Sequence, residues 1–420
     1  MSSFIKNYAS SLLLFAGLVA GALVGAFAPS AAHFLRPVGE IFLNLIFVMV
    51  VPLVFFSTAS AICRLRGSGS LGGLFGTTFG VFLVMSLVAA GLGMLGTSLF
   101  SIAPGEGFSL QGVSGAGSAG SSGGSEAGSL VGSSGAPGTG TAIVGALTAS
   151  DFSLLLSKEH MLALLIFAAL FGFAAAAAGE KGLPVRQLLE SGNEVMVRMV
   201  GLVMKAAPLG LGCYIAGLIP TLGTLVLGGY LRVLLLYCAL TLVLFFIINS
   251  LYVLGSGASL GKFWRHIWEP AATAAATASS AAAIPSAIAA TKRMGVRDSV
   301  AEVVIPLGTN LHRDGSVLGA IFKIAFLMLL TGRIASGPEA LLTILGVALL
   351  ESVVLSAVPS GGLTGEIFIC SVMGFDPSLV TVIVVIGVLI DIPATLLNAG
   401  GNVTAAVVID RLTSRKRAQC

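Results

Sequence analysis

The chain has 420 residues, of which 56% are hydrophobic and only 10% charged, and its formal net charge is +4 at pH 7. Soluble domains carry about 25% charged residues, so the composition excludes a soluble protein and predicts an integral membrane protein. The small net charge and the scattered cysteines give no sign of a nucleic-acid partner, a cofactor or a disulfide framework.

Eight apolar segments are long enough to cross a bilayer as helices, which favours an all-α protein over a barrel. They lie at about 9–29, 40–63, 72–103, 150–178, 186–219, 226–255, 299–331 and 378–411. The first also has features of a secretory signal peptide, with Lys6 before the apolar run, but the run is long for that purpose. Two further apolar regions, about 262–291 and 337–374, are interrupted by Ser, Gly and Pro, and we expect each to form a re-entrant hairpin.

The placement of basic residues predicts the topology. The Gly/Ser-rich segment 104–149 contains no Lys or Arg, and the basic residues gather in connections that this topology places on the opposite side. By the positive-inside rule, both termini are cytoplasmic and the Gly/Ser-rich segment is an extracellular loop. The expected location is the plasma membrane, or the inner membrane of a Gram-negative cell.

The second half of the chain contains a weak internal repeat. "SSAAAIPSA" (279–287) precedes a helix interrupted by "NLHRDG", and "SAVPSGG" (356–362) precedes a helix interrupted by "NAGGN" (398–402). Paired interruptions of this kind are typical of transporters whose binding site lies between inverted repeats. We therefore expect the backbone to unwind at both polar interruptions, around a cavity that satisfies its polar groups.

His312, Arg313 and Asp314 are ionisable residues inside an apolar segment. A kinase catalytic loop is excluded, because Gly319 stands where that motif requires Asn. A loop or a helix end is the plain alternative, but about ten apolar residues flank the triplet on each side. An ionisable group at membrane depth is by default functional. A break between Asn310 and Gly315 would let Arg313 and Asp314 converge on one cavity.

Asp391 is a second acid at membrane depth. Thr395 and Asn398 follow it at helical spacing and extend a polar stripe along one face. A hydrogen bond to a neighbouring helix is the structural alternative for Asp391. The Ser279–Ser280 and Ser356–Ser360 tips offer hydroxyls for a ligand, since a catalytic serine would need a base that the sequence does not supply. Glu351 and Glu366, which flank the second tip, could simply cap a helix or face water.

These segments together resemble the dicarboxylate/amino acid:cation symporters, the glutamate transporter family. The matching segments are "FVMVVPLVFFS" (47–57), "VMKAAPLGLGCY" (203–214), "ASSAAAIPSA" (278–287), "PLGTNLHRDGS" (306–316), "SAVPSGG" (356–362) and "DIPATLLNAGGN" (391–402). The resemblance implies the elevator-type glutamate transporter fold, with eight transmembrane helices and two re-entrant hairpins in inverted repeats. It also implies a homotrimer in which a transport domain moves against a fixed scaffold.

The expected domains follow from the same resemblance. They are scaffold helices 1–2 (1–71), transport-domain helix 3 (72–103), the extracellular loop (104–149), scaffold helices 4–5 (150–225), transport-domain helix 6 (226–261), hairpin 1 (262–298), helix 7 (299–336), hairpin 2 (337–377), and helix 8 with a basic cytoplasmic tail (378–420).

The substrate site implied by the resemblance departs from the family in its charges. The Arg that pairs with an acidic substrate's side chain is Ala394, and another family Arg is Ala278, whereas the Asp that holds an α-amino group is kept as Asp391. The implied substrate contacts are Ser279, Ser280, Ser316, Ser356, Val358, Pro359, Asp391, Thr395 and Asn398. An amine-binding acid without the Arg favours a neutral amino acid, and the alternative is an acidic substrate compensated by Arg313.

The cation site departs as well. The family's last Asp, a sodium ligand, is Asn402, its Asn is His312 and its Met is Arg313. The coupling site is therefore predicted at Asn310, His312, Arg313, Asp314 and Asn402. A fixed positive charge at about 4 Å opposes a second cation by about 4 kcal/mol at an effective dielectric of 20. We expect Arg313, paired with Asp314, to act as a tethered cation in place of sodium.

The sequence thus predicts a secondary active transporter of neutral amino acids with weak or no sodium coupling, and with His312 or an acid as a possible proton carrier. The alternative is a sodium- or proton-coupled symporter of dicarboxylates or acidic amino acids. An anion channel is disfavoured because no charged pore ring is visible. An enzyme is disfavoured because no nucleophile–base pair or metal-ligand cluster is evident. The expected partners are a small-molecule substrate, the lipid bilayer and two further copies of the chain.

Overall fold

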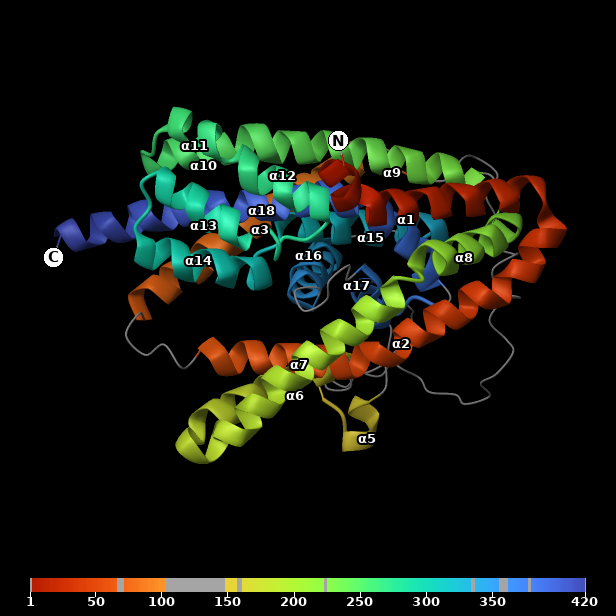
Figure 1. Ribbon diagram of the computed structural model, residues 1–420, viewed down its shortest axis with the longest axis horizontal. Helices are drawn as coiled ribbons and strands as arrows, with labels where there is room; N and C mark the ends of the chain where they lie inside the picture. Colours follow the sequence, from red (N-terminus) through yellow and green to blue (C-terminus); the bar gives the residue numbers. More distant parts are fainter. Residues whose placement is uncertain are drawn as a thin grey trace.

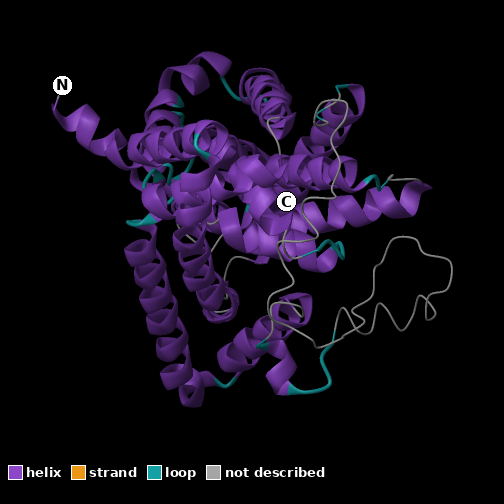
Figure 2. Cartoon of the chain, turned by 90° about the vertical axis from the view of Figure 1, so that its right-hand side faces the viewer, coloured by secondary structure: helices purple, strands orange, loops and turns teal. Residues whose placement is uncertain are grey.

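The computed structural model describes residues 2–65, 72–100, 102, 148–156, 161–222, 225–333, 337–354, 362–376 and 379–419. All regular structure in these ranges is helical (Figure 2). Most of the predicted extracellular loop lies outside the described residues. So do Ser356, Val358 and Pro359 at the predicted tip of the second hairpin.

One group of helices comes mainly from the first half of the chain and packs largely on itself (Figure 1). It contains α1 (Ser2–Phe27), α2 (Pro29–Leu65), α6 (Met161–Ala177), α7 (Leu183–Met204) and α8 (Ala207–Leu222), with the short α5 (Phe152–Leu155) and η3 (Gly179–Gly182). Glycines let these helices touch backbone to backbone, as is common in membranes. A Cβ on Gly21 of α1 would lie 2.0 Å from the carbonyl oxygen of Gly212 on α8.

The predicted helix over 186–219 is two helices. α7 and α8 meet at an angle of 61° after Met204. Pro208 stands at the start of α8, where its ring prevents a regular helix from continuing through the junction.

The second group is built around α18 (Val380–Gln419), the long helix that ends at the C-terminal label in Figure 1. The other members are α3 (Gly72–Leu99), α9 (Leu225–Leu242), the π-helical turn η4 (Val243–Ile248), α10 (Asn249–Ser256), α11 (Leu260–His266), α12 (Trp268–Thr277), α13 (Ile284–Arg293), α14 (Asp298–Leu311), α15 (Asp314–Thr331), α16 (Gly337–Val354) and α17 (Gly362–Val372).

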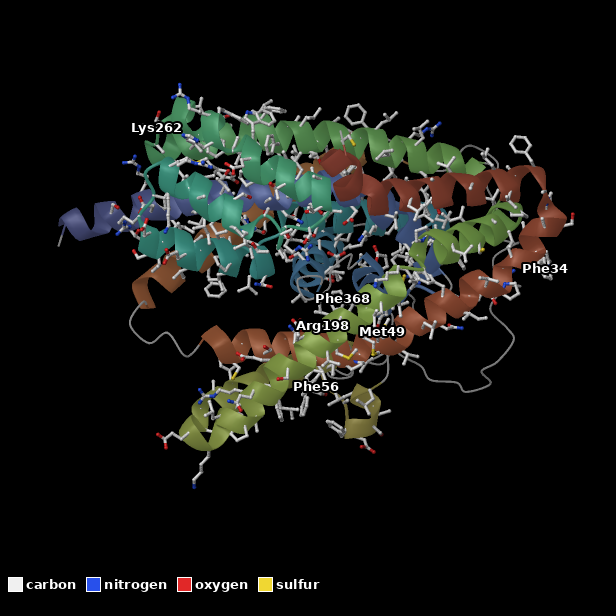
Figure 3. The ribbon with its side chains drawn as sticks, in the orientation of Figure 1. Phe34, Met49, Phe56, Arg198, Lys262 and Phe368 are labelled. Atoms are coloured by element: carbon white, nitrogen blue, oxygen red, sulfur yellow. The ribbon has the colours of Figure 1, made fainter. Side chains whose placement is uncertain are left out.

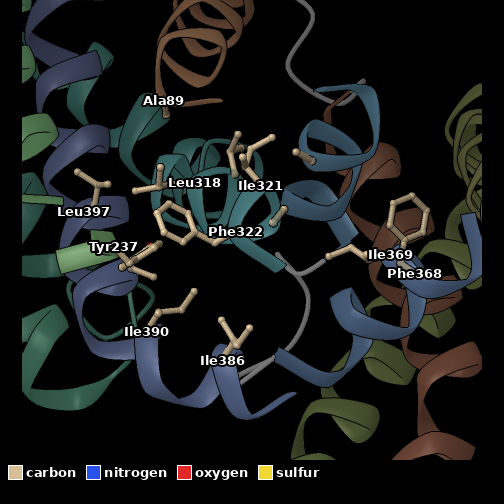
Figure 4. Close-up of a cluster of buried hydrophobic side chains, with 14 of the residues drawn as sticks. Ala89, Tyr237, Leu318, Ile321, Phe322, Phe368, Ile369, Ile386, Ile390 and Leu397 are labelled. Carbon is tan, nitrogen blue, oxygen red and sulfur yellow. The ribbon is translucent and has the colours of Figure 1, made fainter. Parts of the chain in front are cut away.

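α15 is the innermost helix of this group. Most of its residues are apolar and nearly every one is buried, including Asp314 and Lys323, which identifies it as a core helix. Phe322, Leu318 and Ile321 pack with Tyr237 of α9 and Ile390 of α18 (Figure 4). The outer surface is apolar too, as at Phe34 of α2, which is 82% exposed (Figure 3).

Four stretches of the described chain are long and apolar enough to cross a membrane: Gly76–Leu99, Gly228–Ser256, Asp298–Thr331 and Val382–Ser414. The bent α7–α8 pair would make a fifth, and three shorter apolar helices accompany them. The protein is therefore a multi-pass helical membrane protein. The count of eight spans remains a prediction.

The two predicted backbone interruptions have different outcomes. α14 ends at Leu311 and α15 begins at Asp314, with His312 and Arg313 outside helical geometry, so the first break is confirmed. The second is wrong, because α18 is a continuous helix through 398–402. Its glycines make room for neighbours: a Cβ on Gly400 would lie 2.7 Å from the Phe245 ring, and one on Gly401 would lie 3.0 Å from Asp314 Oδ2.

Candidate functional site

The break between α14 and α15 is enclosed by two other helices. The start of α15 lies against α18, where a Cβ on Gly315 would come within 2.3 Å of the Ala394 carbonyl oxygen. On the opposite side, Tyr237 of α9 donates a hydrogen bond to the Gly315 carbonyl at 2.7 Å. The first turn after the break is thus packed against α9 and α18, which fits the rule that irregular backbone at membrane depth lies against protein.

His312 is the centre of a buried polar group that we call the histidine cluster (His312, Asp314, Asn402 and Ser86). The ring is fully buried, and its Nε2 lies 3.0 Å from Asp314 Oδ1 and its Nδ1 3.0 Å from Asn402 Oδ1. Ser86 of α3 donates to Asp314 Oδ1 at 3.2 Å. Phe82, one turn earlier on α3, stacks on the imidazole at 4.6 Å.

Oxygen atoms thus face both nitrogens of the imidazole. An imidazolium carries a proton on both nitrogens, whereas a neutral ring carries only one. The neutral ring can donate to Asn402 from Nδ1, or it can face Asp314 with the N–H at Nε2 and accept at Nδ1 from a turned Asn402 amide. In either state the His312 side chain fills the space between Asp314 and Asn402. A Cβ on Gly308 would come within 2.4 Å of Asn402 Oδ1, so the packing on that side is also tight.

The histidine cluster lacks two residues of the predicted coupling site, Asn310 and Arg313, and adds Ser86. Asp314 pairs with His312, whereas the sequence predicted a pair with Arg313. Asn310 is exposed and donates to the Pro306 carbonyl of its own helix at 2.9 Å, so it does not join the cluster. The backbone leaves helical geometry at His312 and Arg313, and the two side chains therefore have different neighbours.

Arg313 is half-buried and belongs to a second electrostatic environment. The carboxylates whose charges act on it are those of Asp391 on α18 and Glu351 on α16. Asp391 is itself partly exposed, and both Arg313 and Lys323 act on its charge. The guanidinium at the helix break and the Asp391 carboxylate of α18 therefore influence each other electrostatically.

Asn398 is buried against the start of α15. Its Oδ1 accepts hydrogen bonds from the backbone N–H groups of Gly315 (2.8 Å) and Ser316 (3.4 Å), and its Nδ2 lies 3.4 Å from the Ser316 hydroxyl. An oxygen in this position satisfies amide groups that the first turn of a helix leaves without partners. Thr395, one turn earlier on α18, is also buried.

The first hairpin reaches the same stretch of α18. α12 ends at Thr277 and is followed by Ala278, which has a left-handed backbone, and the Ser279 hydroxyl accepts from the Ala282 N–H at 3.3 Å. Ala274 and Ala283 of this hairpin pack on Ala399 of α18. Ser280 is buried and Ser279 is partly exposed. The structure thus packs the first hairpin, beside its serine tip, against Ala399 of α18.

A third polar group was not predicted. We call it the lysine–glutamate cluster: Lys323 of α15, Glu351 of α16 and Glu366 of α17. Lys323 Nζ lies 3.1 Å from Glu351 Oε1 and 2.6 Å from Glu366 Oε1, and the three side chains are at most 4% exposed. A signal was available, because Lys323 interrupts the apolar run "VLGAIFKIAFLMLL" and charges at that depth are functional by default.

The comparisons with known proteins agree on one family. The profile described as "Sodium:dicarboxylate symporter family" matches residues 11–412. The "C4-dicarboxylate transport protein" of Rhodospirillum rubrum is 29% identical over 84% of this chain and 75% of its own length. The "Proton/glutamate-aspartate symporter" of Bacillus subtilis is 27% identical over 94% and 92%. The "Proton/sodium-glutamate symport protein" of Geobacillus stearothermophilus is 25% identical over 95% and 93%.

Proposed function

Because the chain belongs to the sodium:dicarboxylate symporter family, whose members are secondary transporters and not enzymes, we propose that it is a cation-coupled symporter of small dicarboxylates. This replaces the neutral amino acid as the leading substrate. The relatives named for their substrates carry C4-dicarboxylates, glutamate or aspartate, all of which have two carboxylates.

The observation that carries the proposal is the electrostatic influence of Arg313, at the helix break, on Asp391 of α18. In the family that the chain resembles, the Asp at this position holds a substrate's α-amino group. Here the guanidinium of Arg313 already acts on Asp391. An amine would have to compete with it, whereas a dicarboxylate has no amine and can place one carboxylate on Arg313. Arg suits this role because its planar fork binds a carboxylate through two hydrogen bonds.

The proposed mechanism is the elevator mechanism that the resemblance to the glutamate transporter family implies. The helices around α18 form the moving transport domain, and α1, α2, α6, α7 and α8 form the scaffold of a homotrimer with both termini in the cytoplasm. Sodium coupling is weak or absent, because a hard cation needs oxygen ligands and the His312 side chain stands between Asp314 and Asn402.

The test is uptake by the full-length protein in liposomes. Labelled succinate, aspartate and alanine are compared, with sodium and pH gradients imposed separately. We expect succinate to be taken up and exchanged fastest, with little response to sodium. Alanine uptake that succinate does not inhibit would overturn the substrate, and steep sodium dependence would overturn the proposed role of His312.

Arg313→Met is the matching variant, and Arg198→Met is its control. Arg198 lies on the outer side of α7, where it pairs with Glu194 of its own helix, and its side chain is 78% exposed. We expect Arg313→Met to lower succinate exchange at least about tenfold, the equivalent of about 1.4 kcal/mol. Arg198→Met should leave it unchanged.

A further inference from the structure

The lysine–glutamate cluster places unequal charges in a closed space. Lys323 and Glu351 come from α15 and α16, and Glu366 comes from α17, the other arm of the second hairpin. Glu351 and Glu366 are fully buried. Gly365 makes room for Glu351, since a Cβ there would lie 2.5 Å from Glu351 Oε1. One ammonium therefore faces two carboxylates where no solvent reaches them.

The two carboxylates also have unused positions for a proton. Within the described part of the chain, Glu351 Oε2 and Glu366 Oε2 are buried and have no hydrogen-bond partner. A buried carboxylate that lacks a compensating charge takes up a proton, because the neutral acid is far less costly to desolvate. With one proton between Glu351 and Glu366, the cluster as a whole becomes neutral.

The surrounding charges connect this cluster to the substrate region. Arg313 acts on Glu351, and Lys323 acts on Asp391. Glu351 in turn acts on Tyr237 of α9, and Glu366 on Cys370 of its own helix. The charges that act on Glu366 itself are those of Lys323 and Glu351. The described residues of α3 and α6, which pack nearby, include no ionisable group.

We propose that Glu351 and Glu366 share one exchangeable proton, and that this proton is the cation coupled to transport. The proposal rests on the proposed function, because it names the cation of that symport. Binding transfers one proton from a hydronium ion to one carboxylate, which becomes a carboxylic acid, and one water molecule is released. Lys323 remains charged and holds both arms of the hairpin to α15.

Arg313 supplies the coupling between proton and substrate. Before substrate binds, its positive charge favours the ionised form of Glu351. A substrate carboxylate on Arg313 cancels that charge, so Glu351 then binds the proton more tightly. By linkage, the bound proton raises the affinity for substrate by the same factor. Loading of both is favoured over loading of either alone, which is what symport requires.

The experiment separates coupling from transport. Glu366→Gln and Glu351→Gln are made in the full chain and assayed in liposomes for succinate counterflow and for uptake driven by an inward proton gradient. Counterflow needs no net proton movement. We expect counterflow to persist, while stimulation by the gradient, and the internal acidification that a trapped pH dye reports, are lost.

The control is Glu339→Gln, which removes an exposed carboxylate from the start of the same α16 and should keep the full gradient response. If the single variants do not fold, Lys323→Met combined with Glu351→Gln and Glu366→Gln removes all three charges together. This triple variant should likewise keep counterflow and lose the response to the proton gradient. Full gradient stimulation in the glutamate variants would overturn the inference.

The outcomes also distinguish the inference from the function on which it rests. Absence of succinate counterflow in the wild-type protein would overturn the proposed substrate. Loss of the gradient response in His312→Gln, with the response retained in Glu366→Gln, would move the proton to the histidine cluster and overturn the assignment to Glu351 and Glu366.

Discussion

The histidine cluster and the lysine–glutamate cluster lie on the same helix, yet they are built differently. Asp314 and Lys323 are nine residues apart on α15, a rise of about 14 Å. In the histidine cluster one carboxylate faces one imidazole, and glycines of α14, α15 and α18 allow close packing around both groups. In the lysine–glutamate cluster two carboxylates face one ammonium, and the partners come from two arms of a hairpin.

Under the two proposals made above, this difference separates a site filled by the protein's own side chains from a site that exchanges a proton. In the histidine cluster, His312 is the protein's own partner for Asp314, and glycines let the surrounding helices pack tightly around this pair. In the lysine–glutamate cluster, the protein leaves one carboxylate in excess, which only a proton from outside can balance. The first arrangement suits a position from which an ion is excluded, and the second suits a position that loads and unloads.

The largest expected effect comes from removing the only cation of the lysine–glutamate cluster. Lys323→Met leaves Glu351 and Glu366 buried together without an ammonium, and breaking a buried ion pair in this way costs about 3–5 kcal/mol. We expect a large fall in the thermal unfolding temperature of the purified protein in detergent.

Lys262→Met on the exposed end of α11 is the control (Figure 3). Adding Glu351→Gln and Glu366→Gln to Lys323→Met should restore most of the lost stability, because no uncompensated charge then remains. An unfolding temperature that Lys323→Met leaves unchanged would mean that the three charges are not mutually dependent, and the contrast between the two clusters would fail.

The second prediction converts the filled site into an ion site. His312→Asn combined with Asn402→Asp removes the ring and restores the residues of the resembled family, leaving two carboxylates around vacated space. We expect sodium to stabilise this double variant, by about 2.7 kcal/mol at a concentration near 100 times its Kd. The measurement is the unfolding temperature in sodium compared with choline, and the wild-type protein should show no difference. A double variant that is equally indifferent to sodium would show that His312 is not what excludes the ion.

The sequence predicted the helix break correctly but not the directions of its side chains. An ionisable triplet inside an apolar run is a strong signal, and α14 and α15 do separate at His312 and Arg313. The helical repeat gives no information on orientation where the helix is interrupted. For this reason the pair Arg313–Asp314 was predicted, and His312–Asp314 was found.

The other differences between the sequence-based prediction and the structure involve glycine and lysine residues. The pair Gly400–Gly401 fits both an unwound helix and a helix approached closely by its neighbours, and only the packing against Phe245 and Asp314 decides between them. Lys323 was recognisable as a charge at membrane depth. Its partners were not, because Glu351 and Glu366 lie on other helices and no spacing rule connects them to α15.

The smallest expected effect tests how tightly the histidine cluster is packed. In Gly401→Ala, the added methyl group would lie 3.0 Å from Asp314 Oδ2 and 3.4 Å from His312 Cε1. A group forced into a packed site costs about 1–3 kcal/mol, and the gain in helix propensity from Gly to Ala, about 1 kcal/mol, offsets part of it. The matched control is Gly91→Ala on α3, where a Cβ meets nothing within 4 Å. Thermal unfolding should therefore shift downward for Gly401→Ala and stay level or rise for Gly91→Ala. Equal shifts in the two variants would mean that the histidine cluster has room to spare, and an ion could then enter it beside His312.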